Sequence, residues 1–203
     1  MEQMRRRGVG SDQYSARLSD LIADPSQADV VRDYAIQHLT AWIGPVDPEN
    51  SPHEENPDSI RIALTRITAA IQDPSVAQSS IPGTGLNSLA QATPNMPAEV
   101  ADAAWKSLEP YLQGAISGDS QAHLSTRVSA IQAVSLTDQQ QFLPMIRSFA
   151  SSDATEPSIR LSSIASLGFF ANPSDKALLD TLADSKTRYQ YAAQSALKRL
   201  TSR

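Results

Sequence analysis

The chain has 203 residues, of which 40% are hydrophobic and 19% charged, a composition that is ordinary for a soluble globular protein. Its 17 basic and 22 acidic side chains leave a net charge of −5, so the overall field repels the phosphates of nucleic acid. The absence of cysteine excludes disulfides, thiolate nucleophiles and cysteine-based metal sites. No apolar run reaches the roughly 18 to 20 residues of a membrane helix. The N-terminal MEQMRRRGVGSDQ lacks the apolar run of a signal peptide. The absence of cysteine does not decide the compartment, because many exported bacterial-type proteins also lack cysteine. The compartment therefore stays open.

Apolar residues recur at three- and four-residue spacing along most of the chain, which is the pattern of amphipathic helices. No stretch alternates with the period of two that is typical of a strand, so we expect an all-α protein. Ten helices are predicted, and they alternate between the first and the second member of a pair. In chain order they cover residues 14–23, 30–44, 59–72, 81–92, 98–117, 126–136, 139–151, 159–170, 174–183 and 189–200.

The second helices of the pairs share one template. In VVRDYAIQHLTAWIG, small or apolar residues stand three, four and seven positions after Arg32, on one helical stripe. The same template starts at Arg127, at Arg160 and at Tyr189, and a weaker copy starts at Pro82. The copies are irregularly spaced, which helical repeats tolerate because insertions go into surface loops. Since neither helix of a pair can bury its stripe alone, stacked pairs are predicted to share a continuous core.

The pairs predict five repeats in a single domain over residues 1–203. Pro110 and Pro144 are expected inside the first helices of the third and fourth repeats, where a proline bends a helix. An acidic, proline-rich loop over residues 44–58 is interpreted as a solvated insertion or, alternatively, as a cation site or a docking loop for a basic partner. The repeats cover about residues 13–44, 58–92, 98–136, 138–171 and 173–203.

Two segments, ADPSQADVVRDYAIQHL and SDATEPSIRLSSIASL, place Asp and Pro in a turn before a helix that opens with a β-branched residue and Arg. This pattern resembles HEAT-like repeats of the armadillo/HEAT type, and the resemblance extends from about residue 13 onward. It implies an elongated, right-handed α-α superhelix, and the members of this family mostly bind other macromolecules. It also implies that an Asp in the turn holds the second-helix Arg of a neighbouring repeat, which by position gives six residues a structural role: Asp24, Asp119 and Asp153 with Arg32, Arg127 and Arg160.

The expected function is therefore a non-catalytic protein-protein interaction or scaffold module, which holds a protein or peptide partner on the concave face of the second helices. Polar positions beside the apolar stripes are not needed for packing, and they are the predicted partner-binding residues: Asp33, Gln37, His38, Gln132, Ser166 and Gln190. No cofactor, metal or nucleic acid is predicted. The three histidines, His38, His53 and His123, share no spacing typical of metal ligands or of a catalytic base.

Charge is unevenly distributed along the chain. Residues 20–60 hold nine Asp and Glu against one Arg, whereas residues 185–203 hold five Lys and Arg and no acid. The basic residues could stabilise the end of the last helix through its dipole. Alternatively, the oppositely charged ends could dock head to tail, or the acidic stretch could form a groove for a basic partner. Trp42 and Trp105 stand near the ends of helical stripes and are predicted to lie in the core.

Two alternatives stay open. The HEAT-like fold also hosts enzymes, namely DNA glycosylases and lyases that attach tetrapyrroles to proteins. A glycosylase needs a strongly basic concave face, and this acidic chain has only four Lys. The second alternative is one domain of a larger scaffold protein, because the apolar stripe continues to the end of the sequence where a repeat array needs a polar cap.

Overall fold

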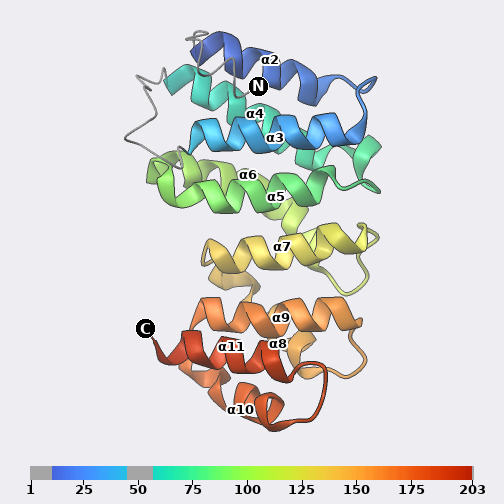
Figure 1. The fold of residues 1–203 in the computed structure, drawn as a ribbon, viewed down its shortest axis with the longest axis vertical. Helices are drawn as coiled ribbons and strands as arrows, with labels where there is room; N and C mark the ends of the chain where they lie inside the picture. Colours follow the sequence, from blue (N-terminus) through green and yellow to red (C-terminus); the bar gives the residue numbers. More distant parts are fainter. Residues whose placement is uncertain (1–10, 45–56, 203) are drawn as a thin grey trace. The chain divides into compact units, whose positions relative to one another are not determined.

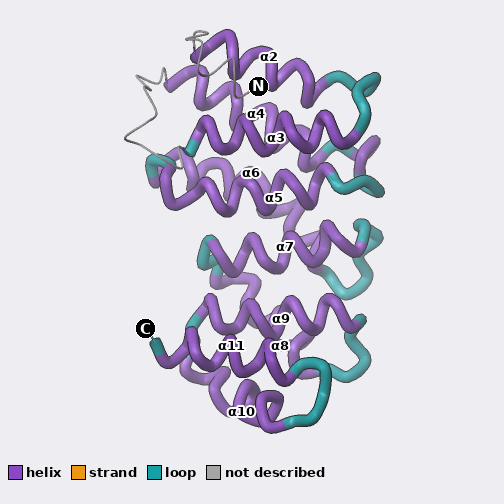
Figure 2. Tube along the Cα trace, in the orientation of Figure 1, coloured by secondary structure: helices purple, strands orange, loops and turns teal. Residues whose placement is uncertain are grey.

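The computed structural model describes residues 11–44 and 57–202, so most of the predicted loop 44–58, including His53, lies outside the described residues. Within these two ranges every regular element is helical, and the all-α prediction is confirmed (Figure 2). The described residues form ten α-helices: α2 (Ser11–Ala23), α3 (Asp29–Ile43), α4 (Pro57–Gln72), α5 (Ile81–Ala92), α6 (Ala98–Ile116), α7 (Leu124–Leu136), α8 (Leu143–Ser151), α9 (Pro157–Phe170), α10 (Lys176–Asp184) and α11 (Gln190–Thr201). Four short 3₁₀ turns accompany them: η1 (Pro74–Val76), η2 (Thr93–Asn95), η3 (Gln140–Phe142) and η4 (Pro173–Asp175).

The helix ends follow from local side-chain chemistry. Glu156 caps α9, because its Oε2 accepts hydrogen bonds from the backbone N–H groups of Ser158 and Ile159 at 2.8 and 2.9 Å. Pro157 then fills the first helical position, where no N–H is required. Helix α9 ends at Phe170, since Ala171 adopts a left-handed conformation with φ of 49°.

Only one of the two prolines lies in the interior of a helix. Pro110 lies within α6, as predicted. The prediction for Pro144 is wrong, because α8 begins at Leu143 and Pro144 stands in its first turn. The residues before it form η3 instead of helix, and a proline in a first turn leaves no hydrogen bond unmade.

The chain divides into two compact units, Met1–Leu112 and Gln113–Arg203, with the boundary inside α6. In the first unit, α2 packs on α3 and on α4, and α5 packs on α3 and on α4 (Figure 1). Its core includes Ile36, Ile67 and Leu86, which are fully buried, and Trp42 and Trp105 are buried as predicted.

A glycine allows a close approach of two helices in the first unit. A Cβ atom at Gly44 would lie 2.5 Å from the carbonyl oxygen of Ala92 and 2.9 Å from its methyl group. The C-terminal ends of α3 and α5 therefore touch through backbone atoms, which only glycine permits at this position.

In the second unit, α9 packs against α7 and against α11, while α8 packs on α9 and α10 packs on α11. A Cβ atom at Gly168 would lie 2.6 Å from the Cα atom of Ala196, so α9 and α11 approach as closely as their backbones allow. Helix α9 thus has neighbours on three sides, and nine of its fourteen residues are buried.

Candidate functional site

Three arginines of second helices make the same backbone contact. Arg32 in α3, Arg127 in α7 and Arg160 in α9 each donate a side-chain hydrogen bond to the carbonyl ten residues earlier. The acceptors are the carbonyls of Ile22 at 3.0 Å, Ser117 at 2.9 Å and Ala150 at 3.2 Å. Each acceptor lies at the C-terminal end of the preceding helix, where carbonyls have no helical partner and a positive charge is favourable.

The carboxylate partners of these arginines differ from one to the next. Arg160 donates to Asp153, so the contact expected for this pair is present. Arg32 meets Asp73 and not the expected Asp24, with 3.8 Å between Nη2 and Oδ2. Asp73 belongs to the turn after α4, so the Arg32 contact joins α3 to the end of α4.

Asp24 is used within its own turn. Its carboxylate accepts from the backbone N–H and the hydroxyl of Ser26 and from the amide of Gln27. The hydrogen bond from the Ser26 hydroxyl is the largest cause that lowers the pKa of Asp24, and the charge of Arg32 adds the least. The expected pair of Asp119 and Arg127 is not formed, although both residues lie in the described part of the chain.

The outward side of α3 carries an exposed stripe that includes apolar residues. Val30 and Tyr34 are 58% and 55% exposed, Gln37 is exposed and Ala41 is half-buried. These four residues follow at four, three and four positions, which places them on one side of the helix. The opposite side of α3 fills the core of the unit, so the fold does not need the apolar side chains of this stripe.

A groove continues the stripe between α3 and α5. It has a volume of about 230 Å³ and begins at Gln37, and Gln91 of α5 lies in its other wall. The remaining lining is small or hydroxylic: Thr40, Ala41, Gly44, Ser88 and Ala92. Amide and hydroxyl groups of this kind can pair with the N–H and C=O groups of a peptide.

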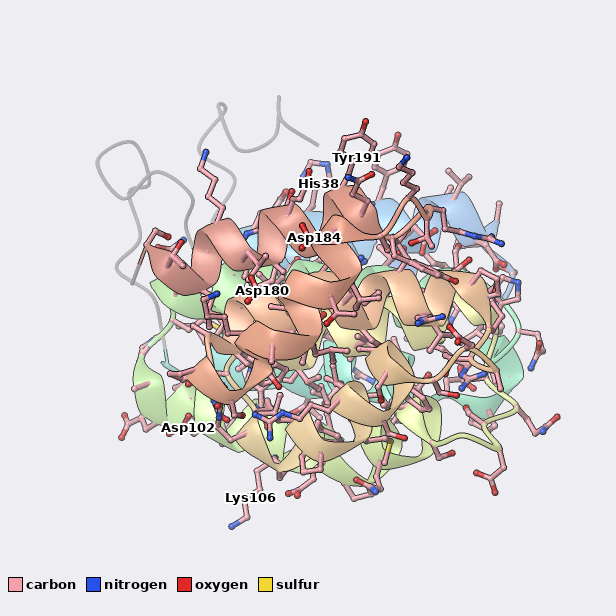
Figure 3. The ribbon with its side chains drawn as sticks, turned by 90° about the horizontal axis from the view of Figure 1, so that it is seen from below. His38, Asp102, Lys106, Asp180, Asp184 and Tyr191 are labelled. Atoms are coloured by element: carbon pink, nitrogen blue, oxygen red, sulfur yellow. The ribbon has the colours of Figure 1, made fainter. Side chains whose placement is uncertain are left out.

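Asp33 and His38 flank the stripe on α3. Asp33 is half-buried, and its Oδ2 accepts a hydrogen bond of 2.7 Å from the hydroxyl of Ser80, just before α5. Asp33 therefore joins α3 to the start of α5 and is not the free polar position that the sequence pattern suggests. His38 is half-buried on the same helix (Figure 3).

The predicted residues of the second unit differ in exposure. Gln132 is exposed on α7, and Gln190 is half-buried at the start of α11. The prediction that Ser166 is exposed is wrong, because this residue is 1% exposed and its Oγ lies 3.4 Å from the carbonyl of Ile131. The template treats all second helices alike, whereas α9 is covered by α7 at this position. Tyr191, which the prediction omitted, is 78% exposed and extends away from α11 (Figure 3).

A larger groove of about 670 Å³ lies between α4 and α6 in the first unit. Leu64, Val100 and Ala104 contribute apolar lining, and Asp58, Arg61 and Glu99 lie at its charged end. Arg61 and Asp58 form an exposed ion pair at 3.3 Å. Such a pair contributes little to stability in water.

Over residues 11–44 and 57–202, no three His, Asp or Glu side chains gather as metal ligands do. Among the helices of these same residues, none is long and apolar enough to span a membrane. Comparison with protein-family models, with curated proteins and with solved structures gives no match for this chain.

Proposed function

We propose that this protein is a non-catalytic interaction module that holds a basic segment of a protein partner along α3 and α5. The exposed stripe of α3, which includes Val30 and Tyr34, is the observation that carries the proposal. Large apolar side chains on the outer side of a helix cost solubility without adding to the core, so they are typical of a contact surface. Tyrosine in particular is enriched among the residues that dominate binding energy.

The charge of the first unit selects the class of partner. Residues 1–112 contain fifteen Asp and Glu against eight Lys and Arg, whereas residues 113–203 contain seven against nine. Asp29 is exposed one residue before Val30, at the start of the stripe. A segment with Lys or Arg would be drawn to this surface and oriented by it, with its apolar side chains on Tyr34.

The proposal also includes the arrangement of the helices as repeats. We infer that the ten helices are five HEAT-like pairs of an α-α superhelix, and that the surface of α3 and α5 belongs to its concave side. The recurring contact of Arg32, Arg127 and Arg160 with a carbonyl ten residues earlier supports this, since equivalent positions of a repeat make equivalent contacts.

A random peptide library displayed on phage and selected on the immobilised protein tests the proposal. Selected peptides should carry net positive charge, and Tyr34→Ala and Gln37→Lys should each weaken their binding about tenfold or more. The control is Ile62→Ala, because Ile62 is 53% exposed on α4, away from the stripe. Acidic selected peptides, or equal binding to the Tyr34→Ala and Ile62→Ala proteins, would contradict the proposal.

Melting temperatures separate binding from stability in this experiment. Gln37→Lys should leave the melting temperature within about 1 °C of the parent value, because the side chain is exposed. Asp33→Lys is unsuitable as a binding variant. It would remove the acceptor of the Ser80 hydroxyl and place an ammonium in a half-buried position.

A further inference from the structure

A pocket in the second unit surrounds one side of Arg127. It has a volume of about 330 Å³ and lies between the start of α7 and the loop that joins α8 to α9. Three hydroxyl groups and Arg127 supply polar lining, and Phe149 and Ile159 supply an apolar part. We call this space the Arg127 pocket, lined by Gly118, Arg127, Ser148, Phe149, Ser152, Ala154, Thr155, Glu156 and Ile159.

Arg127 is the least satisfied of the three equivalent arginines. Its Nη2 donates to the carbonyl of Ser117, but its Nε is buried and meets no acceptor among the described residues. In Arg32 and Arg160 the corresponding Nε donates to a carbonyl, and both guanidinium groups have a carboxylate partner. A buried donor without an acceptor costs about 1 to 3 kcal/mol, and the hydrogen bond to the Ser117 carbonyl leaves the positive charge of Arg127 without a carboxylate partner.

The position of the missing carboxylate is known from the first unit. Arg32 finds Asp73 directly after α4, the first helix of the next pair. Ser152 stands directly after α8 in the same way, and it offers a hydroxyl where Asp73 offers a carboxylate. The following Asp153 is 93% exposed and bonded to Arg160, so it does not serve Arg127.

Glu156, the other charged residue of the pocket, already accepts hydrogen bonds from the backbone. The Oε2 of Glu156 accepts from two backbone N–H groups at the N-terminus of α9, where a negative charge is favourable. The second unit as a whole has an excess of basic residues, nine against seven acidic ones. An oxygen anion in the pocket would therefore face a guanidinium, with the hydroxyls of Ser148 and Thr155 as further donors.

We propose that the Arg127 pocket is a binding site for an oxyanion group of a ligand, a carboxylate or a phosphate. The site is independent of the surface on α3 and α5, because all of its residues belong to the second unit. The guanidinium would pair with the anion through its terminal N–H groups, and this forked arrangement of donors makes arginine selective for planar or tetrahedral oxyanions.

The experiment follows the side-chain Nε–H signals of the arginines by NMR while the intact protein is titrated with inorganic phosphate or with acetate. The Arg127 signal should shift with saturation in at least one titration, and Arg61 should follow only the drift seen with sodium chloride. The arm with the lower dissociation constant identifies the class of anion. An Arg127 signal that moves in neither arm beyond the sodium chloride drift overturns the proposal.

Two variants separate the site from the fold. Arg127→Gln should weaken anion binding about tenfold or more, because a neutral amide replaces a forked cation. Since this change also removes the hydrogen bond to Ser117, Thr155→Val provides a second test that leaves that bond intact. It should weaken binding several-fold with a melting temperature within about 1 °C of the parent protein. Parent affinity in both variants would contradict the assignment.

Discussion

Arg160 stacks on the ring of Tyr189, with 4.6 Å between the guanidinium carbon and the ring centroid. Both residues are buried, at 8% exposure each. Tyr189 occupies the template position of the last helical pair that Arg160 occupies in the pair before it. In the proposed repeat these are equivalent positions of neighbouring pairs, and the contact joins them by a cation-π interaction that is strengthened when water is excluded.

Replacing Tyr189 by Leu should lower the free energy of unfolding by about 1 to 3 kcal/mol. The variant loses the cation-π contact and part of the buried ring surface. Tyr191→Leu is the matched control, since Tyr191 is 78% exposed two residues further on, and it should change the value by less than about 0.5 kcal/mol. Urea unfolding followed by circular dichroism measures both, and equal losses would contradict a role for the stacking.

The ion pair of Arg147 and Asp175 should respond asymmetrically to mutation. The Nε of Arg147 lies 2.5 Å from Oδ1 of Asp175, whose side chain is 3% exposed, while that of Arg147 is 34% exposed. Arg147→Ala leaves a buried carboxylate without its charged partner and should cost about 3 to 5 kcal/mol. Asp175→Ala leaves an arginine that can turn toward water and should cost about 1 to 2 kcal/mol. Denaturant unfolding measures the loss of stability in each variant. A larger loss for Asp175→Ala than for Arg147→Ala would contradict the prediction.

Two glycine-to-alanine substitutions should change the free energy of unfolding in opposite directions. Gly168→Ala places a methyl group 2.6 Å from the Cα of Ala196, so α9 and α11 must separate at a cost of about 1 to 3 kcal/mol. Gly114→Ala has open space around its new methyl group inside α6 and should stabilise the protein by about 0.5 to 1 kcal/mol. Differential scanning calorimetry measures the loss of stability in the first variant and the gain in the second. A double variant with Ala196→Gly should recover part of the Gly168→Ala loss.

Asp73 should contribute a pH-dependent part of the stability. Hydrogen bonds from the hydroxyl and the N–H of Ser75, in that order, hold the pKa of this carboxyl below its usual value of 3.8, with a small further effect of Arg32. The folded state thus favours the ionised form, so the contribution is present above about pH 4 and is lost as the pH falls through the lower folded pKa.

Comparison with Asp73→Asn isolates this contribution. The parent protein should melt roughly 1 to 3 °C above the variant at pH 6, and the difference should shrink toward pH 3. Melting curves across this range check the prediction. A difference that does not change with pH would show that the charge of Asp73 is irrelevant to stability.

The helices could be predicted from the sequence because their apolar spacing is strong and their ends carry turn residues. The stripe after Arg32 is one example, and its buried residues include Ala35, Ile36 and Leu39. The stripe specifies which residues turn inward on each helix, but it does not specify what covers the other sides. Ser166 illustrates this limit, since its position on the template is outward and α7 covers it.

Side-chain partners were harder to predict than helices. Asp24 and Asp73 both stand in Asp-Pro turns, and spacing alone favours the nearer one as the partner of Arg32. A serine holds each carboxylate through Oδ1, but the amide of Gln27 also occupies Oδ2 of Asp24, whereas Oδ2 of Asp73 meets Arg32. The Arg127 pocket was missed for a related reason: the pattern includes Asp119 as a partner, and only the three-dimensional arrangement shows that it does not reach.

The hydrogen bonds from Arg32, Arg127 and Arg160 to carbonyls ten residues earlier bear on how the chain folds. A bond that closes so short a loop is formed at small entropic cost and within one helical pair. Contacts this local favour fast folding, because little of the chain has to be ordered before they form. Each arginine can thus secure its own turn before the neighbouring pair arrives, so the order in which helices leave the ribosome is also an order in which pairs can form.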